Sequence, residues 1–197
     1  MFKTFILLLT MALWVIPAMP AQNETEAIKN LLEERDEEIK ELLGPEGTDY
    51  TQEQRDKLKN IVNDIINYRA MAEYALGNTY HEISDEEREE FVSLFSTIIR
   101  DNSLNRLDIY RAEVIYNNIE VTNGEALVET TAQLDNVRTT VDYKLEIIDG
   151  EWMIVDMTID DVSTAESYNR QYQNIIRRHG FDALLNSLRN RAARAST

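Results

Sequence analysis

The fold is decided by residues 113–159, EVIYNNIEVTNGEALVETTAQLDNVRTTVDYKLEIIDGEWMIVDMTI, in which apolar and polar residues alternate with a period of two. Such alternation is typical of β-strands that bury one face. Three dipeptides that favour tight turns divide the stretch: Asn123-Gly124, Asp135-Asn136 and Asp149-Gly150. The stretch therefore predicts four strands joined by three hairpins, which is an antiparallel meander.

Two-residue turns also predict which residues lie opposite each other, and directly opposed residues share a face of the sheet. The three turns give these pairs: Val121 with Ala126, Ile119 with Val128, Asn117 with Thr130, Ile115 with Ala132, Leu134 with Val137, Thr130 with Val141, Val128 with Tyr143, Ala126 with Leu145, Ile147 with Trp152, and Leu145 with Ile154. The pairs agree on one apolar face. The same register places two polar residues on that face, Asn117 and Asp156, the latter opposite Tyr143.

Helices are predicted before and after the meander, because apolar residues recur there at helical spacing. The predicted helices are Glu24 to Leu43, a helix capped by Thr51, Tyr68 to Leu76, a helix capped by Ser84, a helix with Tyr168, Tyr172, Ile175 and Ile176 on one stripe, and a last helix after Gly180. Arg35 interrupts the apolar face of the first helix. We expect an α+β fold, a four-stranded antiparallel meander wrapped by helices, cone-like (NTF2/cystatin-like) with an apolar cavity.

The N-terminus resembles a secretory signal peptide, with Lys3, an apolar run from Phe5 to Ile16 and a Pro17 to Ala21 exit. Because a bilayer span needs about 20 apolar residues, a cleaved peptide is favoured over an uncleaved membrane anchor. We expect cleavage after Ala21, with Ala18 as the alternative, and a mature protein outside the cytoplasm.

Residues 22–194 are then expected to form a single domain, followed by a frayed tail at 195–197. The chain has no cysteine, which excludes disulfides and thiolate metal sites, and its two histidines, His81 and His179, are far apart in sequence. We expect no metal and no cofactor.

The chain is strongly acidic, with a formal net charge of −16 that becomes −17 once Lys3 is removed. This balance argues against nucleic-acid binding, since phosphates would be repelled. From Arg170 onward, however, six arginines face a single acid, Asp182. Two interpretations stay open: these arginines guide docking to a partner or a membrane, or they complement helix C-termini.

Asp156 is the one candidate for chemistry. An inward carboxylate is costly unless it is paired, so Asp156 is either a general base with Tyr143 as a donor or a structural group paired with Arg170 or with backbone amides. The first interpretation would make the protein a small cone-fold isomerase or hydrolase. The chain contains no Ser-His-Asp order, Gly-rich phosphate loop or HExxH motif.

Five segments, in order, resemble the periplasmic phospholipid-binding proteins of the Mla pathway, also known as toluene-tolerance or ABC transporter auxiliary proteins. The segments are Tyr68-Arg69-Ala70-Met71-Ala72-Glu73-Tyr74-Ala75-Leu76-Gly77, Phe91-Val92-Ser93-Leu94-Phe95, Gly150-Glu151-Trp152-Met153-Ile154-Val155-Asp156, Val162-Ser163 through Tyr168-Asn169-Arg170-Gln171-Tyr172, and Gly180-Phe181-Asp182-Ala183-Leu184-Leu185.

The resemblance implies a non-enzymatic carrier that moves phospholipid across the periplasm between an inner-membrane ABC transporter complex and an outer-membrane lipoprotein complex, with transient membrane proximity. The apolar sheet face and helix stripes provide the residues expected at the acyl tails: Met71, Leu76, Phe95, Ile99, Val128, Tyr143, Leu145, Trp152, Ile154, Tyr172 and Ile176. Asp156 and Arg170 are expected to be structural polar residues.

Overall fold

The computed structural model describes residues 21–44, 51–104 and 107–195. The predicted signal peptide lies outside these residues except for Ala21, and residues 196–197 of the predicted tail also lie outside them. In chain order the elements are α1 (Ala21–Leu43), α2 (Gln52–Ile65), α3 (Tyr68–Leu76), α4 (Thr79–Glu82), α5 (Asp85–Leu104), the 3-10 helix η1 (Leu107–Arg111), β1 (Glu113–Thr122), β2 (Glu125–Leu134), β3 (Val137–Ile148), β4 (Glu151–Ile159), β5 (Val162–Ser163), α6 (Thr164–His179) and α7 (Phe181–Ala195).

The sheet is an open antiparallel meander in the order β1-β2-β3-β4-β5, which confirms the α+β fold class. All three predicted turns are present, and Asn123, Asp135 and Asp149 each adopt the positive φ that such turns require. A fourth hairpin, which was not predicted, turns at Asp160 and Asp161 and adds the two-residue strand β5. Aspartate tolerates this left-handed backbone better than most residues.

The predicted register is correct near the Asn123-Gly124 and Asp149-Gly150 turns and across the whole β2–β3 pair. It fails at two β-bulges. In β1, Tyr116 faces Thr130 and the next pair is Asn118 with Glu129, so Asn117 is an extra residue. In β4 the corresponding extra residue is Val155. Beyond each bulge, the residues that the regular register placed on the inner face lie on the outer face, and the reverse. This follows because side chains alternate strictly along a strand.

Both polar residues predicted on the inner face are therefore misplaced. Asp156 pairs with Lys144 on the outer face, and Met157 takes the place opposite Tyr143. The Asn117 side chain donates from Nδ2 to Thr131 Oγ1 over 2.9 Å.

The same correction applies to the start of β1. Val114, not Ile115, faces Ala132, and Ile115 pairs with Thr131. Tyr116 now lies opposite Thr130, in the position predicted for Asn117.

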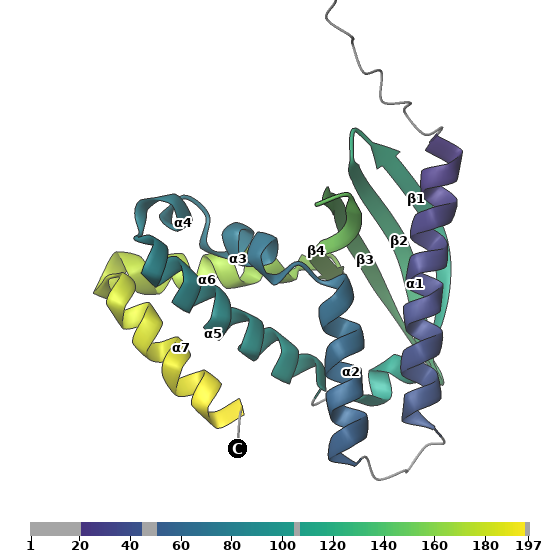
Figure 1. Ribbon diagram of the computed structural model, residues 1–197, viewed down its shortest axis with the longest axis horizontal. Helices are drawn as coiled ribbons and strands as arrows, with labels where there is room; N and C mark the ends of the chain where they lie inside the picture. The colour runs from purple at the N-terminus through teal and green to yellow at the C-terminus, as the bar shows by residue number, and fades with distance from the viewer. Residues whose placement is uncertain (1–20, 45–50, 105–106, 196–197) are drawn as a thin grey trace, which may run out of the picture.

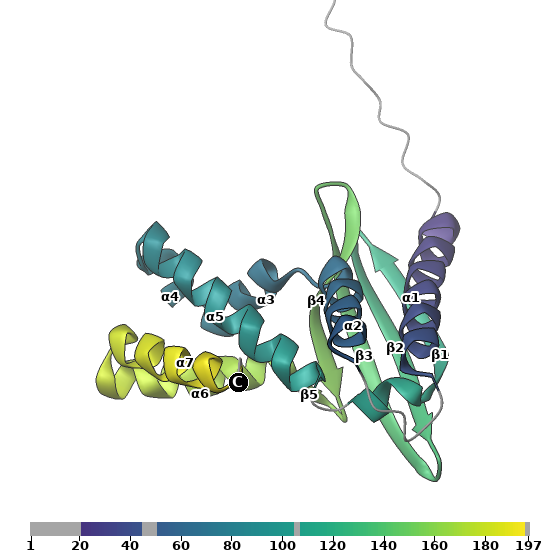
Figure 2. The same ribbon diagram turned by 60° about the horizontal axis from the view of Figure 1, so that its bottom comes forward.

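The helices divide into two groups (Figures 1 and 2). Helices α1 and α2 lie over one face of the sheet, with η1 near the lower end of α1, whereas α3 to α7 form a helical lobe beyond β4. One contiguous hydrophobic core joins both groups. Only part of the helical set therefore covers the sheet, and the remainder packs largely against itself.

Local sequence explains where several helices begin. Thr51 and Gln54 form the predicted capping box at the start of α2. Ser84 and Glu87 form the reciprocal hydrogen bonds of a second box before α5, with 2.9 Å from Ser84 N to a Glu87 oxygen. Ser163 caps α6 by accepting from the Glu166 amide.

The helical lobe is held by an aromatic cluster. Phe91 is fully buried and contacts the rings of Phe95, Tyr172 and Phe181, with centroid distances of 5.9, 5.8 and 6.4 Å. Tyr168 packs edge-on against Phe95 at 5.5 Å. Aromatic pairs with this offset or edge geometry add stability beyond their buried area.

Two segments of the family resemblance pack against each other at Gly77. This glycine ends α3 with a φ of +60°, and a Cβ there would lie 2.9 Å from Asn169 Nδ2. Asn169 Nδ2 in turn donates to Ala75 O over 3.3 Å, and Gln173 donates to Leu76 O over 2.8 Å. Side chains of α6 thus satisfy carbonyls at the C-terminus of α3, which would otherwise lack partners.

Candidate functional site

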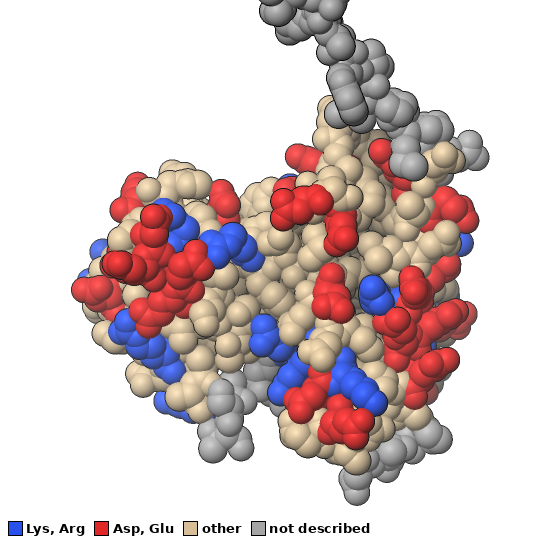
Figure 3. All heavy atoms as spheres, viewed as in Figure 1, with Lys and Arg blue, Asp and Glu red and all other residues tan. Residues whose placement is uncertain are grey.

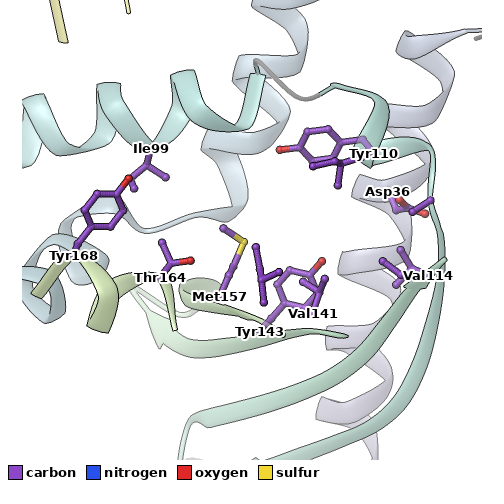
Figure 4. Close-up of a pocket in the computed structure, with 13 residues that line it drawn as sticks. Asp36, Ile99, Tyr110, Val114, Val141, Tyr143, Met157, Thr164 and Tyr168 are labelled. Carbon is purple, nitrogen blue, oxygen red and sulfur yellow. The ribbon is translucent and has the colours of Figure 1, made fainter. Parts of the chain in front are cut away.

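A cavity of about 310 Å³ lies above the apolar sheet face, at the end near the β2–β3 turn. Figure 4 shows Asp36, Tyr110 and Val114 at one end of the cavity and Ile99 and Tyr168 at the other. Most of its lining is apolar, and the lining residues are Asp36, Ile99, Ile109, Tyr110, Ala112, Val114, Ala132, Val141, Tyr143, Met157, Ile159, Thr164 and Tyr168. This size lies at the lower end of the range for small-molecule pockets.

A second, smaller cavity of about 130 Å³ lies between α1, α2 and the same sheet face. The residues that line both cavities are Asp36, Tyr110, Val114, Tyr143 and Met157. Methionine has an unbranched, flexible side chain that adapts to irregular spaces. The Met157 side chain can therefore adapt to a ligand in either cavity.

The η1 segment, which carries Tyr110, is fixed to the end of α1. Arg111 donates from Nη2 to Leu43 O over 3.2 Å and also donates to Gly44 O. These contacts satisfy carbonyls at the C-terminus of α1 and place a cation near the negative end of the helix. They hold the wall of both cavities in position.

Several tyrosines line the cavities, among them Tyr116 and Tyr143. Burial raises the pKa of the Tyr143 phenol well above its usual range, and the charges near it, including Asp36, act in the same direction. Burial likewise raises the pKa of Tyr116, with Tyr143 and Asp36 contributing. Both phenols are therefore neutral at physiological pH, and the charged residues in the cavity lining are Arg35 and Asp36.

The residues predicted at the acyl tails separate into three sets. Ile99, Tyr143 and Ile154 line one or both cavities. The predicted residues that are fully buried in the core are Met71, Leu76, Phe95, Val128, Leu145 and Tyr172. Trp152 and Ile176 are half-buried and pack against this core.

Asp156 lies outside both apolar cavities. Its Oδ1 accepts hydrogen bonds from the amides of Met157 and Ala165, at 2.8 and 2.9 Å, and its Oδ2 accepts from the Ser163 hydroxyl at 2.5 Å. Of the two structural partners considered, the backbone amides are the ones present. Arg170 instead forms an ion pair with Glu166 at 2.8 Å.

This arrangement gives Asp156 a clear structural effect. It joins β4 to the first turn of α6, where helical amides lack partners of their own. Each carboxylate oxygen already accepts a hydrogen bond, and the shallow pocket beside it is lined by polar groups such as Lys144, Glu166 and Asn169. The site resembles a helix cap more than the pocket of a general base.

The sequence pattern did not predict that Asp36, Tyr110, Val114, Tyr116 and Met157 would line the cavities. Three of them, Val114, Tyr116 and Met157, face inward because of the bulges. A signal for this was present, since a regular register placed two polar residues on an otherwise apolar face. Such a conflict indicates a bulge as readily as a functional group.

Within the described residues, none of the helices combines the length and apolar character needed to cross a bilayer. The same residues contain no cluster of three or more side chains suited to hold a metal ion.

The sequence model of the MlaC protein family matches residues 33–190. None of the curated proteins matches the sequence. Among solved structures, the fold is similar to that of a phospholipid-binding protein from Ralstonia solanacearum, solved in complex with a phospholipid, with a TM-score of 0.71 and 18% sequence identity over 88% of this chain and 98% of that chain. Because the family model spans most of the sequence, this chain belongs to the MlaC protein family.

Proposed function

We propose that this protein is a lipid carrier that holds the acyl tails of a phospholipid in the two apolar cavities. The observation that carries the proposal is the pair of apolar cavities between the sheet face and the helices α1, α2 and η1. Membership of the MlaC family supports it. The similar Ralstonia protein was solved with a phospholipid bound.

The physical case rests on the cost of exposing acyl chains to water. Two tails contain about 30 methylenes, and each is worth roughly 0.8 kcal/mol when removed from water. A free phospholipid therefore almost never leaves a membrane unaided. A dry protein cavity removes that barrier while adding little net affinity over the bilayer, so the partner that is engaged can decide the direction of transfer.

We further propose that the carrier works in the periplasm, after cleavage of its signal peptide, between an inner-membrane ABC transporter complex and an outer-membrane lipoprotein complex. The arginine-rich C-terminal segment is a candidate docking region, but its arginines are not equivalent. Arg189 forms a bidentate pair with Glu90 at 2.6 and 2.7 Å, and Arg191 lies over the Tyr168 ring. Arg177 and Arg178, at the end of α6, are better placed to meet a partner.

Enzymatic use of Asp156 is the less favoured alternative. Its carboxylate lies outside the apolar cavities and is hydrogen-bonded to Ser163 and two amides. A substrate in either cavity would have to reach it across the sheet.

The experiment that tests the carrier proposal is mass spectrometry of the organic extract from purified protein, combined with a variant that fills the cavity. Ala132 lines the larger cavity, and Ala132→Phe would place a ring in that space. The matched control is Leu127→Phe, which adds bulk on the outer face of the same strand, where Leu127 is 42% exposed.

We expect close to one diacyl phospholipid per wild-type protein, a several-fold lower content in Ala132→Phe, and an unchanged content in Leu127→Phe. A wild-type extract without lipid, or equal lipid in all three proteins, would contradict the proposal.

A further inference from the structure

Arg35 is an unusual residue for the core-facing stripe of α1. It interrupts the apolar stripe that includes Leu32 and Ile39, and it lines the smaller cavity. Its Nη1 pairs with Glu38 Oε2 at the surface over 2.8 Å. Its Nε, by contrast, is buried, and no described residue accepts a hydrogen bond from it. A buried donor without an acceptor is costly, so a ligand atom that accepted a hydrogen bond from it would stabilise this arrangement.

Asp36 borders the same space from the next position of the helix. It lines both cavities, and its Oδ2 pairs with Lys40 over 2.7 Å while its side chain stays 27% exposed. Successive residues of an α-helix point about 100° apart. Arg35 and Asp36 therefore flank the edge of the smaller cavity from two directions, one as a cation and one as an anion.

The surroundings of this pair are acidic. Figure 3 shows acidic side chains gathered over α1, where the sequence places Glu33, Glu34, Glu37, Glu38 and Glu41 around it. An anionic ligand without a cationic group would meet Arg35 but would also meet this negative field. A ligand that carries a negative and a positive charge would be attracted both by Arg35 and by the acidic side chains around it.

We propose that Arg35 binds the phosphodiester of the lipid headgroup and that Asp36 favours a headgroup with an ammonium group, so that the protein selects zwitterionic over anionic phospholipids. This inference rests on the proposed carrier function. The acyl tails then occupy the two cavities, and the headgroup lies at the edge of the smaller one, beside Arg35 and Asp36. Guanidinium nitrogens match phosphate oxygens in geometry, and charge-assisted hydrogen bonds of this kind are stronger than neutral ones.

The first arm of the test compares headgroups. Lipid-free protein is incubated with vesicles that contain equimolar phosphatidylethanolamine and phosphatidylglycerol with identical acyl chains, and the protein-bound lipids are counted by mass spectrometry. We expect the wild type to take up the ammonium-bearing lipid in excess by about 5-fold, a modest factor because the pair is partly exposed to solvent.

Two variants distinguish a specific contact of Asp36 with the ammonium group from a general effect of the acidic residues on α1. Asp36→Asn should bring the ratio of the two lipids close to unity. Glu37→Gln removes the same charge from an exposed position of the same helix, and it should keep the wild-type ratio. Equal uptake of both lipids by the wild type would overturn the inference, as would an identical change in both variants.

The second arm tests the phosphate contact. Arg35→Met keeps an apolar stem and should leave the fold intact, but it should lower phospholipid uptake about 10-fold relative to the wild type. Uptake of diacylglycerol, which has the same tails and no phosphate, should be equal in the two proteins. A parallel loss of both lipids would overturn the assignment, and if Arg35→Met failed to fold, the Asp36→Asn comparison would still decide.

Free phosphate is the other source of the same chemistry. If excess inorganic phosphate raises the melting temperature of the wild type but not of Arg35→Met, while the two proteins take up phospholipid equally, the site binds free phosphate and the headgroup assignment is wrong. A wild type that binds neither phospholipid nor diacylglycerol would instead refute the carrier function itself.

Discussion

The two ends of the sheet are built from the same strands, yet one end is solid and the other is hollow. Near the Asn123-Gly124 and Asp149-Gly150 turns, the directly opposed residues Ala126 and Leu145 are buried in the core. Toward the opposite end, Tyr143 and its neighbours face the cavities. The bulges in β1 and β4 lie at the boundary between the two ends. The comparison shows that apolar residues of the same strands form a packed core at one end of the sheet and line cavities at the other.

The largest effect is expected for a truncation at the solid end. Leu145→Ala removes a side chain that is fully buried, and such a cavity in a packed core costs about 3 kcal/mol. Denaturant unfolding should show this loss, while the variant that still folds should keep its bound lipid. A loss below about 1 kcal/mol would mean that the core end tolerates voids as well as the hollow end does.

A smaller effect is expected at the boundary. Asp156→Asn weakens the hydrogen bonds to Ser163, Met157 and Ala165, and we expect a loss of about 2 kcal/mol. Asp142→Asn, which removes an outward-facing carboxylate from β3, is the matched control and should change stability little. If Asp156→Asn were equally stable but lost an activity on a small substrate, the enzyme alternative would be correct.

The smallest effect is expected at the hollow end. Met157 lines both cavities, so Met157→Ala enlarges a space that is already present, and we expect a loss of about 1 kcal/mol or less, below the usual 2–5 kcal/mol for a core methionine. Denaturant unfolding of lipid-free protein measures this. A loss as large as that of Leu145→Ala would show that the hollow end is packed after all.

Turn chemistry made much of the fold predictable. The Asn-Gly and Asp-Gly signals fixed the pairs next to the turns, and caps such as Thr51 and Ser84 fixed helix starts. The prediction failed beyond Asn117 and Val155, because a bulge adds a residue without a turn-like composition. Strand β5 was missed because its two residues are too few for a visible alternation.

The site was harder to predict than the fold, for a physical reason. Leu145 and Ile154 are opposed neighbours of similar chemistry, yet Ile154 lines the smaller cavity and Leu145 is sealed in the core. Cores and lipid cavities use the same apolar residues. Only the three-dimensional positions of the covering helices, which no local pattern encodes, separate them.

The bulges also determine where the chain tolerates a change of length. Asn117 and Val155 are the extra residues of the two bulges and have no directly opposed residue in the neighbouring strand. Loss of either residue would therefore restore a regular strand and leave each remaining side chain on its present face. A deletion elsewhere in the same strands would turn the following residues over. For Asn117, which is exposed, such a loss would remove no buried side chain. Natural or engineered length variants of this sheet should therefore concentrate at position 117.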